Sequence, residues 1–158
     1  MGFNIAGIVV NKNYENKIEE LSEKLGFELS FQGEISYEEA VSNWKDDDIC
    51  DIYFAENATI LYLTMEMCGS EFNIESQNVL SFCYSETSMA FSFNYTENSQ
   101  LQRSIMEYNG DIMNESGEPL PEESNTDTGG LIFAKVTEIL GKDFLDVDFE
   151  SKAYRYNV

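Results

Sequence analysis

The sequence predicts an α+β protein, with an antiparallel sheet of about six to eight strands and two or three helices packed on one face of it. Three observations predict this class. Several short stretches alternate apolar and polar residues, as strands with one buried face do. Other stretches have apolar residues at helical spacing beside capping residues. The 158 residues are 42% hydrophobic and 13% aromatic, enough for the core of one domain spanning 1–158.

The first elements are a strand and a helix. A short β-branched run over 3–10 predicts a buried strand. In the segment that follows, Asn13 is a candidate N-cap and Gly26 stands where a helix would end. The apolar residues of this predicted helix are Ile18, Leu21 and Leu25.

Four further elements precede residue 66. FELSFQG (27–33) alternates aromatic or aliphatic residues with polar ones and predicts a strand. SYEEAVSNW (36–44) opens with a capping box from Ser36 to Glu39 and predicts a short helix. ICDIYF (49–54) and TILYLTM (59–65) are apolar runs separated by a short polar segment, which predicts a hairpin.

After an irregular segment over 66–78, VLSFCYSE and MAFSFNY show the clearest strand alternation in the chain. QLQRSIMEY and GDIMN continue the predicted meander. LIFAKVTEILG predicts a helix that begins near Asp127 or Thr128 and ends at Gly141, and FLDVDFESKAYRY predicts a last strand. We expect these side chains to face the helices: Leu80, Phe82, Tyr84, Met89, Phe91 and Phe93.

The net charge of −21 is concentrated in the middle of the chain. Residues 46–134 contain 17 acids and one base, Arg103. A surface this negative repels nucleic acids and anionic membranes and attracts basic proteins. Solubility alone would also explain the charge, so composition leaves both interpretations open.

The sequence lacks the residues on which several common kinds of catalytic and binding site depend. The chain has no histidine, the commonest general base and neutral metal ligand. It contains no glycine-rich phosphate-binding motif. Asp46, Asp47 and Asp48 are adjacent in sequence, so their side chains would diverge on an extended chain, and solvated charge explains them better than a metal site. We therefore predict a protein that is not an enzyme and has no cofactor and no metal.

Three cysteines without CxxC spacing indicate reduced thiols and a cytoplasmic location. The N-terminal apolar run is too short for a signal peptide, and no run is long enough for a membrane span.

Arg103 lies between apolar alternation partners on a predicted strand, where a guanidinium needs an acidic partner. The candidates are Glu86 and Glu107. A surface arginine without a fixed partner is the other interpretation.

The segment SGEPLPEESNTDTGG (116–130) contains both prolines of the chain, at positions i and i+2. Two prolines so close stiffen the backbone, which predicts a rigid arm rather than a flexible lid. If this arm displays its acids, Glu118, Glu122 and Glu123 form an acidic edge. A basic partner would bind there and at Asp46, Asp47 and Asp48, with these acids gathered on one face. A plain connection between sheet and helix is the alternative.

The succession SFCYSETSMAFSF, QRSIMEYNGDI, GEPLPEE and a helix ending in ILGKDF resembles a family of small bacterial proteins grouped as a domain of unknown function. The resemblance covers about residues 79–145 and implies no activity, so no functional residue is carried over. In composition the chain is also similar to immunity proteins of bacterial toxin systems, which are small, acidic and cytosolic.

These observations predict an acidic, non-enzymatic protein that binds a basic protein partner, as an immunity protein or an inhibitor does. The alternative is a small-molecule-binding or carboxylate-dependent enzymatic domain with an aromatic pocket. The sheet aromatics Phe82, Tyr84, Phe91, Phe93 and Tyr95 are candidates for such a pocket, although aromatic rows of this kind more often form core.

Overall fold

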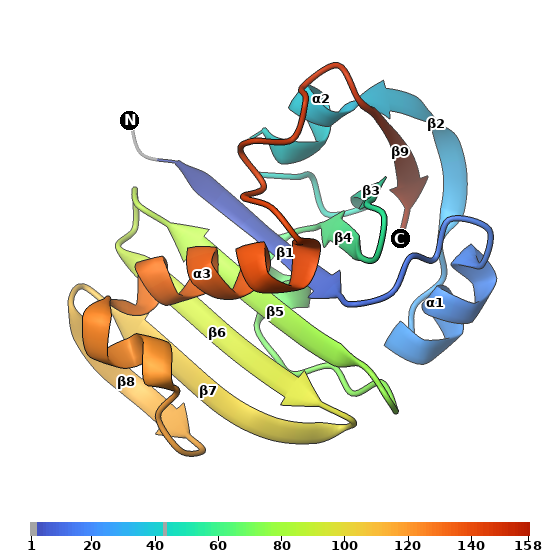
Figure 1. Ribbon diagram of the computed structural model, residues 1–158. Helices are drawn as coiled ribbons and strands as arrows, with labels where there is room; N and C mark the ends of the chain where they lie inside the picture. Colours follow the sequence, from blue (N-terminus) through green and yellow to red (C-terminus); the bar gives the residue numbers. More distant parts are fainter. Residues whose placement is uncertain (1–2, 43) are drawn as a thin grey trace.

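The computed structural model describes residues 3–42 and 44–158 and places its nine strands in one antiparallel sheet (Figure 1). The strand order is β2-β9-β3-β4-β1-β5-β6-β7-β8. The strands are β1 (Asn4–Val10), β2 (Ser30–Ser36), β3 (Ile49–Phe54), β4 (Thr59–Tyr62), β5 (Asn78–Ser85), β6 (Ala90–Glu97), β7 (Gln100–Tyr108), β8 (Asp111–Ser116) and β9 (Lys152–Asn157). The helices are α1 (Ile18–Leu25), α2 (Tyr37–Val41) and α3 (Thr128–Leu140), with 3-10 helices η1 (Met65–Cys68) and η2 (Pro121–Asn125).

The sheet has a hydrophobic core on each face. The central strand β1 pairs with β4 and β5, and all seven of its residues are buried. Its side chains alternate, so that Ile5 and Val9 enter one core while Ile8 and Val10 enter the other. The first core contains α2 and α3, and we call this side of the sheet the α3 face. The second contains α1 and part of the irregular segment over 66–78, and defines the α1 face.

The α+β class with an antiparallel sheet is therefore confirmed, but the predicted count of six to eight strands is too low. The expectation of helices on a single face is also wrong, because α1 packs into the core on the face opposite α2 and α3. Strands near the middle of the sheet are apolar at both odd and even positions. A sheet of this kind needs cover on both sides.

Most of the predicted inward-facing residues lie in the first core. Leu80, Phe82 and Phe93 are fully buried there, and Tyr84 and Phe91 pack against it. Met89 is the exception, because it lies in the β5–β6 turn with a φ of +52° and is largely exposed. The predicted strand therefore begins one residue too early, because β6 starts at Ala90.

Capping residues set the starts of α2 and α3, as the sequence predicts. The Asp127 side chain accepts a hydrogen bond from Gly130 N at 2.8 Å at the start of α3. Ser36 Oγ does the same for Glu39 N at the start of α2. Asn13 is not the N-cap of α1, since its side chain instead accepts from Glu15 N in a local turn before the helix.

Three predicted elements are shorter in the structure. The strand predicted over 59–65 ends at Tyr62. Of FLDVDFESKAYRY, only the last part forms β9, while Phe144 and Val147 reach the first core from turns. β9 then inserts between β2 and β3, a non-local pairing that local alternation does not reveal. The helix predicted over 36–44 ends at Val41, and Asn43 lies outside the described residues.

Candidate functional site

Arg103 on β7 forms the centre of an ionic cluster beneath the proline-containing segment. Its side chain is buried, with 4% of the residue exposed. Nε and Nη2 donate to the two carboxylate oxygens of Glu123, each at 2.9 Å. Nη2 also donates to Glu115 at 3.2 Å, and Nη1 donates to the carbonyls of Ser116 and Gly117. Two parallel hydrogen bonds to one carboxylate are the strong geometry for arginine.

The prediction that Arg103 needs an acidic partner is confirmed, but both named candidates are wrong. Glu86 accepts a hydrogen bond from Phe3 N at 3.2 Å, and Glu107 accepts one from Thr128 Oγ1 at 2.8 Å. The actual partners are Glu115 on the neighbouring strand β8 and Glu123, which lies 20 residues along the chain beyond both prolines. The expectation of a partner on a neighbouring strand holds for Glu115 but does not identify Glu123, because Glu123 belongs to a segment that folds back over the sheet.

Glu123 also forms a hydrogen bond within its own segment. Its carboxylate accepts from Leu120 N at 2.6 Å, at the start of η2. Burial raises the pKa of this carboxyl, but the hydrogen bonds from Arg103 and Leu120 outweigh it, so the pKa lies below its ordinary value. Beside it, Glu122 lies 3.1 Å from the buried Lys135 of α3. The segment is thus tied to both sheet and helix.

Because of these contacts, the three acids of the predicted acidic edge differ in how accessible they are. Glu118 is exposed, whereas Glu122 and Glu123 are partly buried and already paired with bases. The structure therefore keeps only Glu118 of the three fully available to a partner. Whether this edge binds a partner stays a prediction.

A cavity of about 210 Å³ opens between β7, β8 and the N-terminal end of α3, and we call it the acidic pocket. Its lining includes the apolar side chains of Ile105, Ile112 and Leu131. Its wall has four carboxylates and one guanidinium, which gives an excess of three negative charges. The lining includes Arg103, Ile105, Glu107, Ile112, Glu115, Glu123, Asp127 and Leu131.

The second predicted acidic group lies elsewhere. Asp46, Asp47 and Asp48 are exposed in the loop that leads into β3, beside the C-terminus, where Val158 N donates to Asp48 O. β3 and β7 are five positions apart in the strand order. The two acidic groups are therefore attached to separate parts of the sheet, and a binding role for either remains a prediction.

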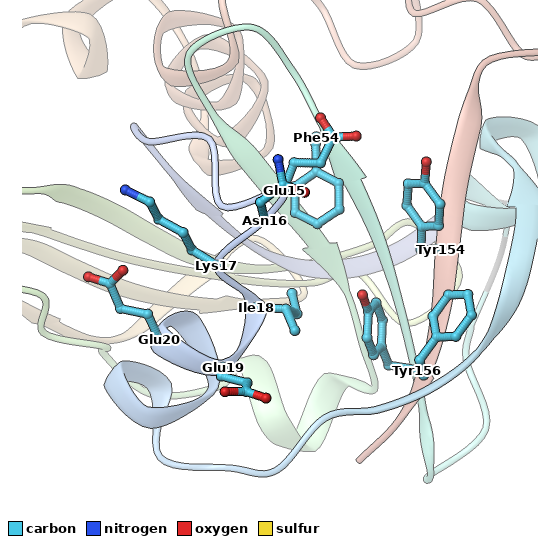
Figure 2. A pocket seen from close by; sticks show the side chains of 10 residues that line it. Glu15, Asn16, Lys17, Ile18, Glu19, Glu20, Phe54, Tyr154 and Tyr156 are labelled. Carbon is cyan, nitrogen blue, oxygen red and sulfur yellow. The ribbon is translucent and has the colours of Figure 1, made fainter.

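A larger hollow, the aromatic groove, lies between the start of α1 and the strands β2, β9 and β3. Its volume is about 660 Å³. Figure 2 shows Tyr154 and Tyr156 on one side of it and the side chains of Glu15 to Glu20 on the other. Phe31 is 60% exposed, and its ring centroid lies 5.6 Å from that of Tyr156 and 6.4 Å from that of Tyr154.

The aromatic pocket expected from the sheet aromatics is not at the predicted place. Phe82, Phe93 and Tyr95 are buried in the first core, with Tyr84 and Phe91 packed against it. The groove instead uses aromatics that β2, β3 and β9 bring together. Only the pairing of β9 with both other strands places them side by side.

The cysteines do not offer reactive thiolates. Cys50, Cys68 and Cys83 are free and buried. Burial raises the pKa of all three thiols, that of Cys83 to about 12. At neutral pH they are protonated, and a nucleophilic role has no support.

Comparison with protein-family models, with curated proteins and with solved structures finds no match for this chain. The resemblance of residues 79–145 to a bacterial family therefore stays a prediction. Across 3–42 and 44–158, none of the helices has the length and apolar character needed to cross a membrane.

Proposed function

We propose that this chain is a non-enzymatic binding protein that recognises a basic protein partner, as an immunity protein or an inhibitor does. The partner contacts the acidic pocket and the neighbouring Glu118. The three free thiols fit a cytoplasmic location.

The observation that carries this proposal is that most of the acids have no basic side chain beside them in the fold. Seven of the nine lysines and arginines lie within 4.0 Å of a carboxylate, in pairs that involve seven of the 30 acids. The other 23 acids have no lysine or arginine at such a distance within the described part of the chain. Four of these bases, Lys45, Arg103, Lys135 and Arg155, form pairs that are buried or partly buried in the fold, and most of the negative charge is left for solvent or for a basic surface.

Association with the partner is expected to be fast at low ionic strength and to slow as salt is added, because the Debye length is only about 8 Å at physiological salt. Affinity purification from the native host with mass spectrometry supplies the partner, and stopped-flow kinetics measures its association rate. The variant Asp111→Asn/Glu118→Gln removes two exposed charges near the acidic pocket. We expect it to lower the association rate by roughly threefold or more at low salt.

Glu122 and Glu123 are unsuitable for this test, because Lys135 and Arg103 engage them in the fold. The matched control is Glu19→Gln/Glu23→Gln, which removes two exposed charges from α1. A third variant, Asp46→Asn/Asp47→Asn, tests the acidic loop before β3. A salt-independent association rate that is equal for all three variants would contradict the proposal.

The aromatic groove supports a second candidate function, the binding of a small molecule. Its volume of about 660 Å³ is in the range of ligand sites. Within the described residues, the hydroxyls of Tyr154 and Tyr156 have no hydrogen-bond partner, and neither is a buried unsatisfied group. Both hydroxyls are therefore available to a ligand.

Aromatic fragments carrying a hydrogen-bond acceptor are expected to shift the NMR signals of this groove, and Phe31→Ala is expected to weaken their binding at least fivefold, since aromatic contacts contribute about 1 kcal/mol or more. Phe149→Ala removes another exposed phenylalanine and serves as the control. Equal binding by both variants would exclude the groove as the site.

A further inference from the structure

The strand β8 forms one edge of the sheet and pairs only with β7 (Figure 1). All six of its residues are exposed. In an antiparallel sheet, alternate backbone N–H and C=O groups of an edge strand point outward without a strand partner. Within residues 3–42 and 44–158, no strand pairs with the outer side of β8.

β8 lacks two of the usual protections against strand pairing. Asp111–Ser116 contains no lysine and no proline, the residues that commonly prevent an added strand from docking. Met113, 63% exposed, occupies the position where the register with β7 shifts. That irregularity bends the edge locally but leaves the strand open on its outer side.

β8 contributes side chains to the acidic pocket on the α3 face. Ile112 lies opposite Glu107 in the β7–β8 pairing, and both line the pocket on the α3 face. Glu115 lines it too. Side chains of a strand alternate between the two faces of a sheet. Every second residue of a strand added beside β8 would therefore lie on the α3 face, next to these carboxylates.

The negative charge around β8 indicates which kind of segment would pair with this edge. No base occurs between Arg103 and Lys135, whereas the same interval contains Glu107, Asp111, Glu115 and Glu118 among its acids. A second copy of this chain would bring the same acids and a net charge of −21 to the edge, which disfavours self-pairing. A basic extended segment has the opposite charge.

We propose that β8 accepts an extended segment of the basic partner as a tenth strand, with lysine or arginine at alternate positions facing the acidic pocket. Main-chain hydrogen bonds would supply affinity, and the alternate basic side chains would supply specificity. The inference rests on the proposed function, for which it names the mode of recognition.

The probe is a nine-residue peptide that alternates lysine with valine or threonine. We expect it to bind and to slow hydrogen exchange of outward β8 amides at least tenfold at saturation, as measured by NMR. Methylation of the peptide's backbone nitrogens along one edge should weaken binding at least tenfold, because it removes the N–H donors and keeps the charge. A peptide with glutamate in place of lysine should not bind.

On the protein side, Met113→Lys adds a positive charge at the edge and is expected to weaken peptide binding at least fivefold. Leu145→Lys makes the same change in charge at another exposed apolar residue, away from β8, and should bind within twofold of the unmodified chain. Circular dichroism checks that both variants fold.

The possible contrary results overturn different parts of the proposal. Binding that is insensitive to backbone methylation, or protection confined to the aromatic groove, overturns strand addition but leaves the salt-dependent association of the proposed function intact. Dimerisation in analytical ultracentrifugation that Met113→Lys abolishes would make a second copy the occupant and overturn the basic segment. Failure of the lysine peptide to bind also contradicts strand addition.

Discussion

Asp51→Asn is expected to lower the free energy of unfolding by about 3–5 kcal/mol, the cost of breaking a buried ion pair by removing one partner. Asp51 on β3 is fully buried. Its Oδ1 accepts from Arg155 Nε at 2.9 Å, and its Oδ2 accepts from Arg155 Nη2 at 3.0 Å and from Lys45 Nζ at 2.8 Å. Asparagine would leave two cations without a counter-charge and would turn an N–H₂ group toward their donors.

Lys45 provides a second measurement on the same variant. Burial lowers the pKa of its ammonium group, and the hydrogen bond and charge of Asp51 oppose that effect. Without the carboxylate the pKa of Lys45 is expected to fall further, which NMR of the side-chain amine can follow.

Urea unfolding at pH 7 measures the stability change. Asp48→Asn makes the same chemical change at an exposed position three residues away and should alter stability by less than about 0.5 kcal/mol. The double variant Lys45→Met/Asp51→Asn should recover part of the lost stability, because it also removes the positive charge that Asp51→Asn leaves unpaired. Equal stability of Asp51→Asn and Asp48→Asn would show that the buried cluster does not stabilise the fold.

Arg103→Ala is the second large effect, with an expected loss of about 3 kcal/mol. The substitution removes both hydrogen bonds to Glu123 and those to the carbonyls of Ser116 and Gly117. The Glu123 side chain is only 19% exposed, so water replaces the guanidinium poorly. Since these contacts tie the proline-containing segment to β7, amide exchange should increase first in η2.

Arg103→Lys separates charge from geometry. Lysine keeps the positive charge but cannot form two parallel hydrogen bonds to one carboxylate, so we expect an intermediate stability. If Arg103→Lys is as stable as the unmodified chain, the positive charge alone accounts for the stabilisation by this cluster. The two parallel hydrogen bonds to Glu123 would then contribute nothing further.

The effect of Arg103→Ala should also depend on pH. Because the folded-state pKa of Glu123 is lowered, its contribution is present above the ordinary glutamate pKa of about 4.3 and is lost as pH falls through the folded value. The difference in unfolding free energy between Arg103→Ala and the unmodified chain should therefore shrink in acid. A constant difference between pH 7 and pH 2 would contradict the role of the Glu123 carboxylate.

Local patterns in the sequence were sufficient for much of the secondary structure. Alternation identified β5, β6 and β7, and capping residues placed the start of α2 and both ends of α3, because these features depend on neighbours within a few residues. The need of Arg103 for a carboxylate also followed from its apolar surroundings on one strand.

Tertiary structure alone decided which groups meet. β9 pairs with β2 and β3 from more than 90 residues away, and this brings Arg155 to Asp51 and assembles the aromatic groove. Glu123 reaches Arg103 only because its segment folds back over β7. Such pairings depend on the path of the whole chain rather than on local periodicity. The sequence by itself therefore determined the elements and the excess of acid, while the fold decided which acids are paired and which remain free.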